Sequence, residues 1–240
     1  MLKAVDKNVT VTAPRMAIVQ IPIQHLEPLV IARFNKKAEL MEKMAEGQSA
    51  KNKKERKARE YEKEAEESKH ISECGWEGIC ASAFRSACIS ACRLVGYKMT
   101  VAKLSIFFLA DGYDAKEGTP LVRIYGDKAI TYTSHVRNAT GVVDIRSRPM
   151  YKKWGALLNV RYDQDQFSAD DVVNLIARVG LQVGIGEGRP DSKNSAGLGF
   201  GLFEIVSGKE EAQFLKKYGI KKLTIRRGLP WTGTARHGEA

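Results

Sequence analysis

The chain has 240 residues, 43% of them hydrophobic, which is typical of a globular protein with a substantial core. No apolar run approaches the roughly 18 residues of a transmembrane helix, and the first residues lack a secretory apolar segment. These features argue against a helical membrane protein, and we expect a cytoplasmic protein with no membrane partner. The formal net charge of +11 favours a polyanionic partner, nucleic acid before a membrane surface.

The first expected element is a strand over residues 15–24, where side chains alternate in character. Pro22 lacks an amide donor, which indicates a strand end or an edge position. Residues 35–74 then form a charged, alanine-rich insertion that we expect to be helical or disordered. Its lysines and arginines either contact phosphate or simply cover a solvated surface.

The cysteines lie within one short region, at Cys74, Cys80, Cys88 and Cys92. They contain no CxxC pair and no histidine stands at zinc-finger spacing, so we expect no metal site. An alanine-rich helix is predicted over 77–95, with Cys88 and Cys92 one turn apart on its apolar side. We expect buried free thiols that pack as small apolar residues.

The middle of the chain predicts further alternating strands and one clear helix. A strand over 100–110 precedes an insertion over 111–150, and another strand follows over 151–163. Within the insertion, short strands are expected over 121–126, 129–134 and 141–146. A helix is predicted over 168–180, with Ser168 as N-cap and Asp171 completing a capping box.

The stretch from 180 to 206 is rich in glycine. Its six most closely grouped glycines are Gly184, Gly186, Gly188, Gly197, Gly199 and Gly201. Glycine serves where the backbone needs positive φ or close approach, so this loop is a candidate for holding phosphate on main-chain amides, beside Arg189 and Lys193. The alternative is a long connection into a strand expected over 199–206. A short helix over 210–218 follows, within a basic C-terminal extension over 207–240.

The order of elements predicts the fold class. Two successive β-α-β units give an α+β protein with a ferredoxin-like (RRM-like) βαββαβ core and two large insertions. We expect one domain over 1–240, with the insertions at 35–74 and 111–150.

A ferredoxin-like core with a glycine-rich loop before its last strand resembles the RAMP proteins of CRISPR effector complexes. The matching residues are Gly184-Ile185-Gly186, a polar run, and Gly197-Leu198-Gly199-Phe200-Gly201. VGIGEGRP ahead of GLFEIV is also similar to uncharacterised phage-encoded proteins. The resemblance implies a backbone-type protein that holds single-stranded RNA or DNA, as a homo-oligomer or in a multi-subunit complex. The setting would be phage or anti-phage, in the host cytoplasm if the chain is phage-encoded.

The residues themselves give a second argument for nucleic-acid binding. Cations interleaved with aromatic rings suit single strands, because rings stack on bases while cations meet phosphates. The candidates are Arg146, Arg148, Tyr151, Lys152, Lys153, Trp154 and Arg161, with Arg189 and Lys193 from the glycine stretch. The alternative is that Trp154 belongs to the core and the cations to the surface. The residues from Leu198 to Phe203 resemble an RNA-recognition signature, but they lack its leading cation and fall in the last strand.

Catalytic motifs are missing from the sequence: it has no P-loop, no HExxH and no nucleophile elbow. The four histidines, His25, His70, His135 and His237, are scattered. Some RAMP relatives cleave RNA with a histidine, so His25 or His135 is the candidate for a general acid or base in that alternative. We expect a non-catalytic single-stranded nucleic-acid-binding protein without cofactor or metal. A RAMP-type ribonuclease and a self-assembling scaffold are the alternatives.

Overall fold

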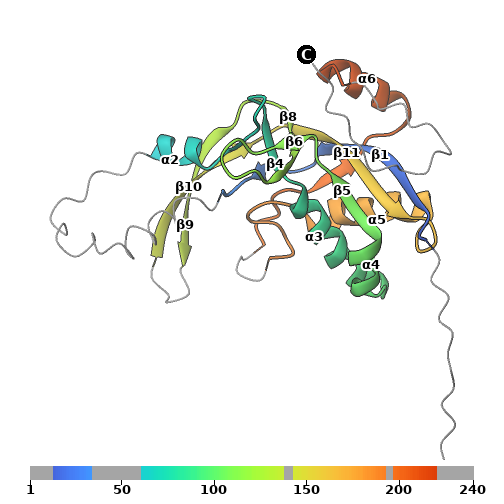
Figure 1. Ribbon diagram of the computed structural model, residues 1–240. Coiled ribbons are helices and arrows are strands. Elements are labelled where there is room, and N and C mark those ends of the chain that lie inside the picture. Colours follow the sequence, from blue (N-terminus) through green and yellow to red (C-terminus); the bar gives the residue numbers. More distant parts are fainter. Residues whose placement is uncertain (1–12, 34–60, 138–142, 193–196, 221–240) are drawn as a thin grey trace, which may run out of the picture.

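The computed structural model describes residues 13–33, 61–137, 143–192 and 197–220, and it is a mixed α+β structure. The predicted α+β class is therefore confirmed. Helices gather mainly on one side of a central antiparallel sheet, and a long hairpin projects from one end of the molecule (Figure 1).

The central sheet has the strand order β12-β1-β11-β5, and every neighbouring pair is antiparallel. Its strands are β1 (Met16–His25), β5 (Ile106–Leu109), β11 (Trp154–Asp163) and β12 (Phe203–Ile205). β8 (Tyr125–Gly126) adds to the start of β11. The register places Ile21 opposite Leu158, so two fully buried aliphatic side chains lie side by side at the centre.

Two helices cover the face of the sheet on which Leu158 lies. These are α3 (Ala81–Ala91), continued by a 3₁₀ turn (Cys92–Val95), and α5 (Ala169–Arg178), continued by a π turn (Val179–Val183). Phe84 of α3 and Ile176 of α5 are both almost fully buried in this core. α6 (Gly208–Tyr218) lies on the other side of the sheet (Figure 1), where Phe214 packs against Gly155.

Two smaller sheets flank the central one. The first has the order β2-β10-β9, and the second has the order β3-β4-β7-β6. Their strands are β2 (Leu29–Val30), β9 (Ile130–Arg137), β10 (Val143–Tyr151), β3 (His70–Ile71), β4 (Glu77–Cys80), β7 (Pro120–Arg123) and β6 (Gly112–Tyr113). The short helix α2 (Tyr61–Glu67) packs against the β9–β10 hairpin.

The structure corrects the strand predicted over 100–110. Its first half is helix α4 (Met99–Ser105), and only Ile106–Leu109 is a strand. Ala102 and Ser105 are buried three positions apart while Leu104 between them is exposed, which is helical spacing rather than alternation.

Other boundaries also move. The helix predicted over 77–95 begins only at Ala81, because Glu77–Cys80 pairs with β7 as a strand. The strand predicted over 199–206 shortens to Phe203–Ile205, since Gly199 and Gly201 have positive φ. The short strands predicted over 129–134 and 141–146 belong to one longer hairpin.

The capping box of α5 is confirmed. The Ser168 hydroxyl accepts a hydrogen bond from the Asp171 amide at 3.1 Å, and the Asp171 carboxylate accepts one from the Ser168 amide at 2.9 Å. In the part of the chain that the structure describes, no helix combines the length and apolar character needed to cross a membrane.

Candidate functional site: the groove beside helix α3

The six grouped glycines of the 180–206 stretch all adopt positive φ, one of the two uses of glycine considered for them. Two of them also allow close backbone approach. A Cβ at Gly201 would lie 1.8 Å from the carbonyl oxygen of Ile185, and one at Gly186 would lie 2.4 Å from that of Val30. Any side chain at these positions would clash, so the backbone can fold back on itself only with glycine.

Many amides of the glycine stretch bond to backbone carbonyls. Ile185 donates to Gly201 at 3.1 Å, Gly201 donates to Pro28 at 2.8 Å, and Glu187 donates to Val30 at 2.8 Å. These bonds tie the stretch to the segment that connects β1 and β2. Amides already paired in this way are not available to a phosphate, so the stretch acts here as a rigid wall.

A hollow of about 760 Å³ lies between this wall and α3. We call it the α3 groove. Its polar lining includes the side chains of His70, Cys80, Ser82, Ser86, Ser90, Arg93, Arg189 and Asp191.

The groove face of α3 presents a row of hydroxyls. Ser82, Ser86 and Ser90 are four residues apart, so they lie along one side of the helix, while Phe84 and Cys88 point into the core. No acidic residue occurs in the first turn of α3. A helix N-terminus without acidic side chains leaves its partial positive charge available to an anion in the groove.

The charged side chains of the groove wall are predominantly positive. Arg93 forms an ion pair with Asp191 at 2.9 Å, and Arg189 donates to the carbonyl oxygen of Gly186 at 2.9 Å. The Ser90 hydroxyl, then Arg93 and Arg189, hold the pKa of Asp191 below its ordinary value, against the effect of burial. Two guanidinium groups against one carboxylate leave the wall with a net positive charge.

The β9–β10 hairpin is attached beside the glycine stretch. Arg148 donates to the Glu187 carboxylate at 3.0 Å, and the ring centroids of Tyr132 and Phe200 lie 5.5 Å apart, edge to face. Arg146 is two residues from Arg148 on the same strand and so shares its face. The hairpin therefore places Arg148 against the glycine stretch, with Arg146 farther along the same strand face.

The two aromatic rings predicted among these cations are buried. Trp154 is 1% exposed and its indole N–H donates to the Glu27 carbonyl at 2.9 Å, while Tyr151 is 2% exposed. The alternative that placed Trp154 in the core is thus confirmed, and neither ring is available for stacking on a base in this structure.

The remaining predicted cations do not form one cluster with the hairpin arginines. Lys152 and Lys153 are exposed at the turn between β10 and β11. Arg161 lies on the sheet face away from α3, with its guanidinium 5.0 Å from the centroid of the Phe107 ring. Lys193 lies outside the described residues.

Neither candidate histidine stands in the α3 groove. Nδ1 of His25 lies 3.1 Å from the carbonyl oxygen of Trp154, an ordinary structural contact at the end of β1. His135 is exposed on β9, opposite Ile145. His237 lies outside the described residues.

The structure also shows a group of polar side chains that the sequence did not predict. Nδ1 of His70 lies 3.0 Å from Oδ2 of Asp114, and its Nε2 lies 3.5 Å from Sγ of Cys80. The β3–β4 pairing brings His70 and Cys80 together, and Asp114 comes from the connection between β6 and β7. The only sequence signal is the turn at Gly75 between His70 and Cys80, which is too common to indicate a site.

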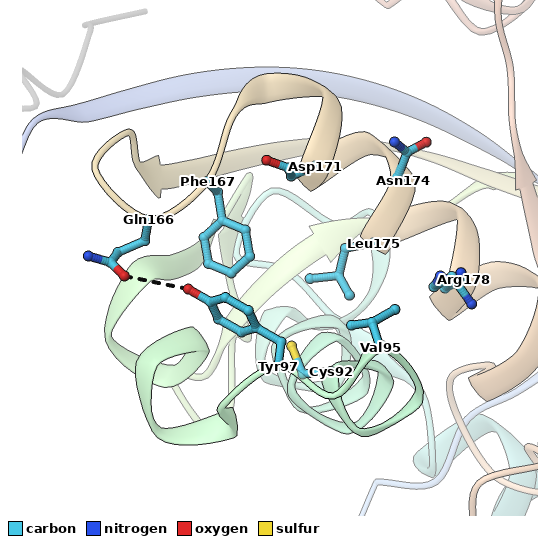
Figure 2. A pocket seen from close by; sticks show the side chains of 9 residues that line it. All are labelled: Cys92, Val95, Tyr97, Gln166, Phe167, Asp171, Asn174, Leu175 and Arg178. Carbon is cyan, nitrogen blue, oxygen red and sulfur yellow. Dashed lines mark hydrogen bonds between the residues drawn. The ribbon is translucent and has the colours of Figure 1, made fainter.

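A second, smaller hollow of about 320 Å³ lies between the 3₁₀ turn and α5. Tyr97, Phe167 and Leu175 surround it (Figure 2), and the Tyr97 hydroxyl donates to Gln166 at 3.5 Å. Its carboxylate, Asp171, is already held in the capping box of α5. The α3 groove is larger and is lined by more charged side chains than this hollow, so it is the better candidate.

The comparisons with known proteins place the chain in no family: no family model matches it, and no curated protein shows significant sequence similarity to it.

Proposed function

We propose that this chain binds single-stranded nucleic acid in the α3 groove and does not cleave it. The observation that carries the proposal is the composition of the groove wall, in which Arg93, Arg189 and a row of serine hydroxyls line a hollow of about 760 Å³. Guanidinium groups and hydroxyls are the donors that proteins use most often on phosphate and sugar. A hollow between one helix and one loop is expected to hold a single sugar–phosphate strand.

We further propose that the core is ferredoxin-like. Support comes from the arrangement of its two β-α-β units. In the first unit, α3 joins β1 to β5, and β11 lies between these two strands in the sheet. In the second unit, α5 joins β11 to β12, and β1 lies between them. Each unit is thus split by a strand of the other, as in the split βαβ arrangement of ferredoxin-like domains.

In this proposal the bases are contacted at the base of the β9–β10 hairpin. Tyr132 and Phe200 are both half-buried there, and they replace the buried Tyr151 and Trp154 as candidates for stacking. Arg146 and Arg148, on one face of β10, would contact the sugar–phosphate backbone of the nucleic acid where it leaves the groove.

A repeating assembly on RNA or DNA, of the RAMP-like kind found in phage or anti-phage systems, is the arrangement in which such a protein would act. Each copy would cover a short length of strand, and the hairpin that projects from one end would reach the neighbouring copy (Figure 1). A scaffold without nucleic acid would instead assemble equally well with or without added strand.

The test is fluorescence anisotropy with labelled 30-mers of single-stranded RNA and DNA across a salt series. We expect affinity to fall linearly in log salt, with the slope reduced by about 0.7 for each phosphate contact removed. Arg93→Gln, Arg189→Gln and Arg148→Gln should each reduce the slope. Arg178→Gln, which removes an exposed arginine of α5 outside the groove, is the matched control.

Two results would contradict the proposal. One is the absence of binding to either strand at low salt. The other is an equal loss of slope in the groove variants and in Arg178→Gln, which would reduce the effect to overall charge. Intact RNA after prolonged incubation is expected, and cleavage lost in His25→Ala or His135→Ala would favour the ribonuclease.

A further inference from the structure

Cys80, His70 and Asp114 form a hydrogen-bonded chain at the edge of the α3 groove. Nε2 of His70 is within hydrogen-bond reach of Sγ of Cys80, and its Nδ1 faces the Asp114 carboxylate at 3.0 Å. A nucleophile, a base and a third group that orients the base is the arrangement that activates thiols in nucleophilic catalysis. Both Cys80 and His70 line the groove, so a ligand there can reach them.

Asp114 is built to orient the imidazole. Its Oδ1 accepts hydrogen bonds from the amides of Lys116 and Glu117, both at 2.9 Å, which leaves Oδ2 facing Nδ1 of His70. Burial alone would raise its pKa, but these amides, His70 and Arg33 together lower it. A carboxylate that stays ionised favours a proton on Nδ1 and leaves Nε2 to exchange a proton with the thiol.

The backbone around Cys80 supplies the remaining part of such a site. Cys80 is the N-cap of α3, an eleven-residue helix, and its side chain makes no capping hydrogen bond. The first-turn amides of Ser82 and Ala83 therefore donate no hydrogen bond to this thiol. Amides at a helix N-terminus can stabilise both a thiolate and the oxyanion that forms when a thiolate attacks a carbonyl.

We propose that Cys80 is the nucleophile of an acyl-transfer site, with His70 as its base and Asp114 as a positioning residue, and that its substrates are esters or thioesters. In the first step the thiol proton passes to Nε2 of His70, and Sγ bonds to the carbonyl carbon. The bond to the leaving group then breaks, and the leaving alcohol or thiol takes the proton from His70. In the second step a water molecule gives a proton to His70 while the water oxygen attacks the thioester formed on Cys80. The bond to Sγ then breaks, and Cys80 departs as the thiolate.

The groups around His70 favour the charged form of its imidazole. Burial disfavours the charged ring, but contacts with Cys80 and then Asp114 raise the pKa of His70 overall. Arg33 forms ion pairs with Asp114 at 3.5 Å and with Glu117 at 2.7 Å, and Arg189 also lines the groove.

The chain contains its own control for thiol reactivity. Cys74 is exposed in the turn that precedes β4, whereas Cys80 is half-buried. Exposure alone would make Cys74 the faster thiol, and activation by His70 would make Cys80 faster.

The first experiment measures alkylation of the full chain by iodoacetamide at pH 6.5, with adducts located by peptide mass spectrometry. We expect Cys80 to react at least tenfold faster than Cys74, and His70→Asn to slow Cys80 at least tenfold while Cys74 is unchanged. A cooperative melting transition of His70→Asn well above the assay temperature would show that the slower reaction does not come from misfolding. A Cys80 rate equal to or below that of Cys74 would overturn the proposal.

The second experiment tests the acyl step with p-nitrophenyl acetate. We expect a burst of one p-nitrophenolate per chain and an acetyl group on Cys80, both absent in Cys80→Ser and retained in Cys74→Ser. Fast alkylation without acetylation of Cys80 would overturn the acyl-transfer assignment. Nucleic acid is absent from both experiments, so their outcome is independent of binding in the α3 groove.

Discussion

Individual glycines set the shape of the 180–206 stretch, for two separable reasons. Gly199 has a φ of 80° and open space around it, so only its backbone conformation favours glycine. Gly201 has a φ of 72° and also lies against the Ile185 carbonyl, where a Cβ would stand at 1.8 Å. The two positions therefore separate backbone strain from steric contact.

We predict that alanine is tolerated at one of these positions and not at the other. Gly199→Ala should lower the free energy of unfolding by about 1–2 kcal/mol, since it strains only φ. Gly201→Ala should lower it by at least about 3 kcal/mol, because the backbone must also move away from the new methyl group. Urea denaturation of both variants checks this, and equal losses would contradict the close approach of Ile185.

His70 gives the protein a pH-dependent stability. Its pKa is raised in the folded state. At pH values above the ordinary histidine pKa, the folded state therefore binds more protons than the unfolded state. This contribution is fully present below that value and is lost as pH rises through the folded pKa. The groups that face His70 are Cys80 and Asp114, with Arg33 behind the latter.

We predict that the urea concentration at the unfolding midpoint decreases as the pH is raised from 6 to 8. His70→Asn should remove most of this decrease. His135→Asn, at an exposed position on β9, is the matched control and should leave the fall intact. The same fall in all three proteins would show that another group is responsible.

At the scale of elements, the two C-terminal helices begin in different ways. α5 starts with a complete capping box between Ser168 and Asp171, whereas the N-cap of α6, Ser207, makes no side-chain capping bond. A capping bond satisfies an amide that the first helical turn leaves unpaired.

We therefore expect Ser168→Ala to lower the free energy of unfolding by about 1 kcal/mol, the usual loss for an N-cap serine. Ser207→Ala should change it by much less, since no capping bond is removed. Denaturation curves of the two variants provide the measurement. An equal effect would mean that the Ser168 bond contributes little.

At the scale of the whole molecule, the central sheet and the β3-β4-β7-β6 sheet share one core. Ile79 of β4 and Val122 of β7 belong to the same buried cluster as Leu158 of β11 and Phe84 of α3. A shared core couples the two sheets, so neither buries its apolar side chains without the other.

From this shared core we predict a single cooperative unfolding transition for the described body. Leu158→Ala should lower the free energy of unfolding by about 2–5 kcal/mol, through lost transfer energy and a cavity. Leu198→Ala, at an exposed position, should have little effect. Far-UV circular dichroism and tryptophan fluorescence should report the same midpoint in each protein, and two separate midpoints would contradict one core.

The sequence by itself determined the features that depend on near neighbours along the chain. These include the capping box at Ser168 and the buried thiols Cys88 and Cys92. Each follows from local spacing or from the conformation of a single residue, and such preferences act before distant segments meet. The order of β1, α3, β5, β11, α5 and β12 follows similarly, because periodicity is local, whereas α4 and β4 were not predicted.

Only the tertiary structure decided which side chains meet across long separations. Alternation places Trp154 and Arg161 on opposite faces of β11, but it could not show which face the helices cover, since β11 is apolar along much of its length. The helix over 99–105 was missed because its apolar run fits either period. The meeting of His70, Cys80 and Asp114 depends on two strand registers, and register is fixed by pairing partners that the local sequence does not specify.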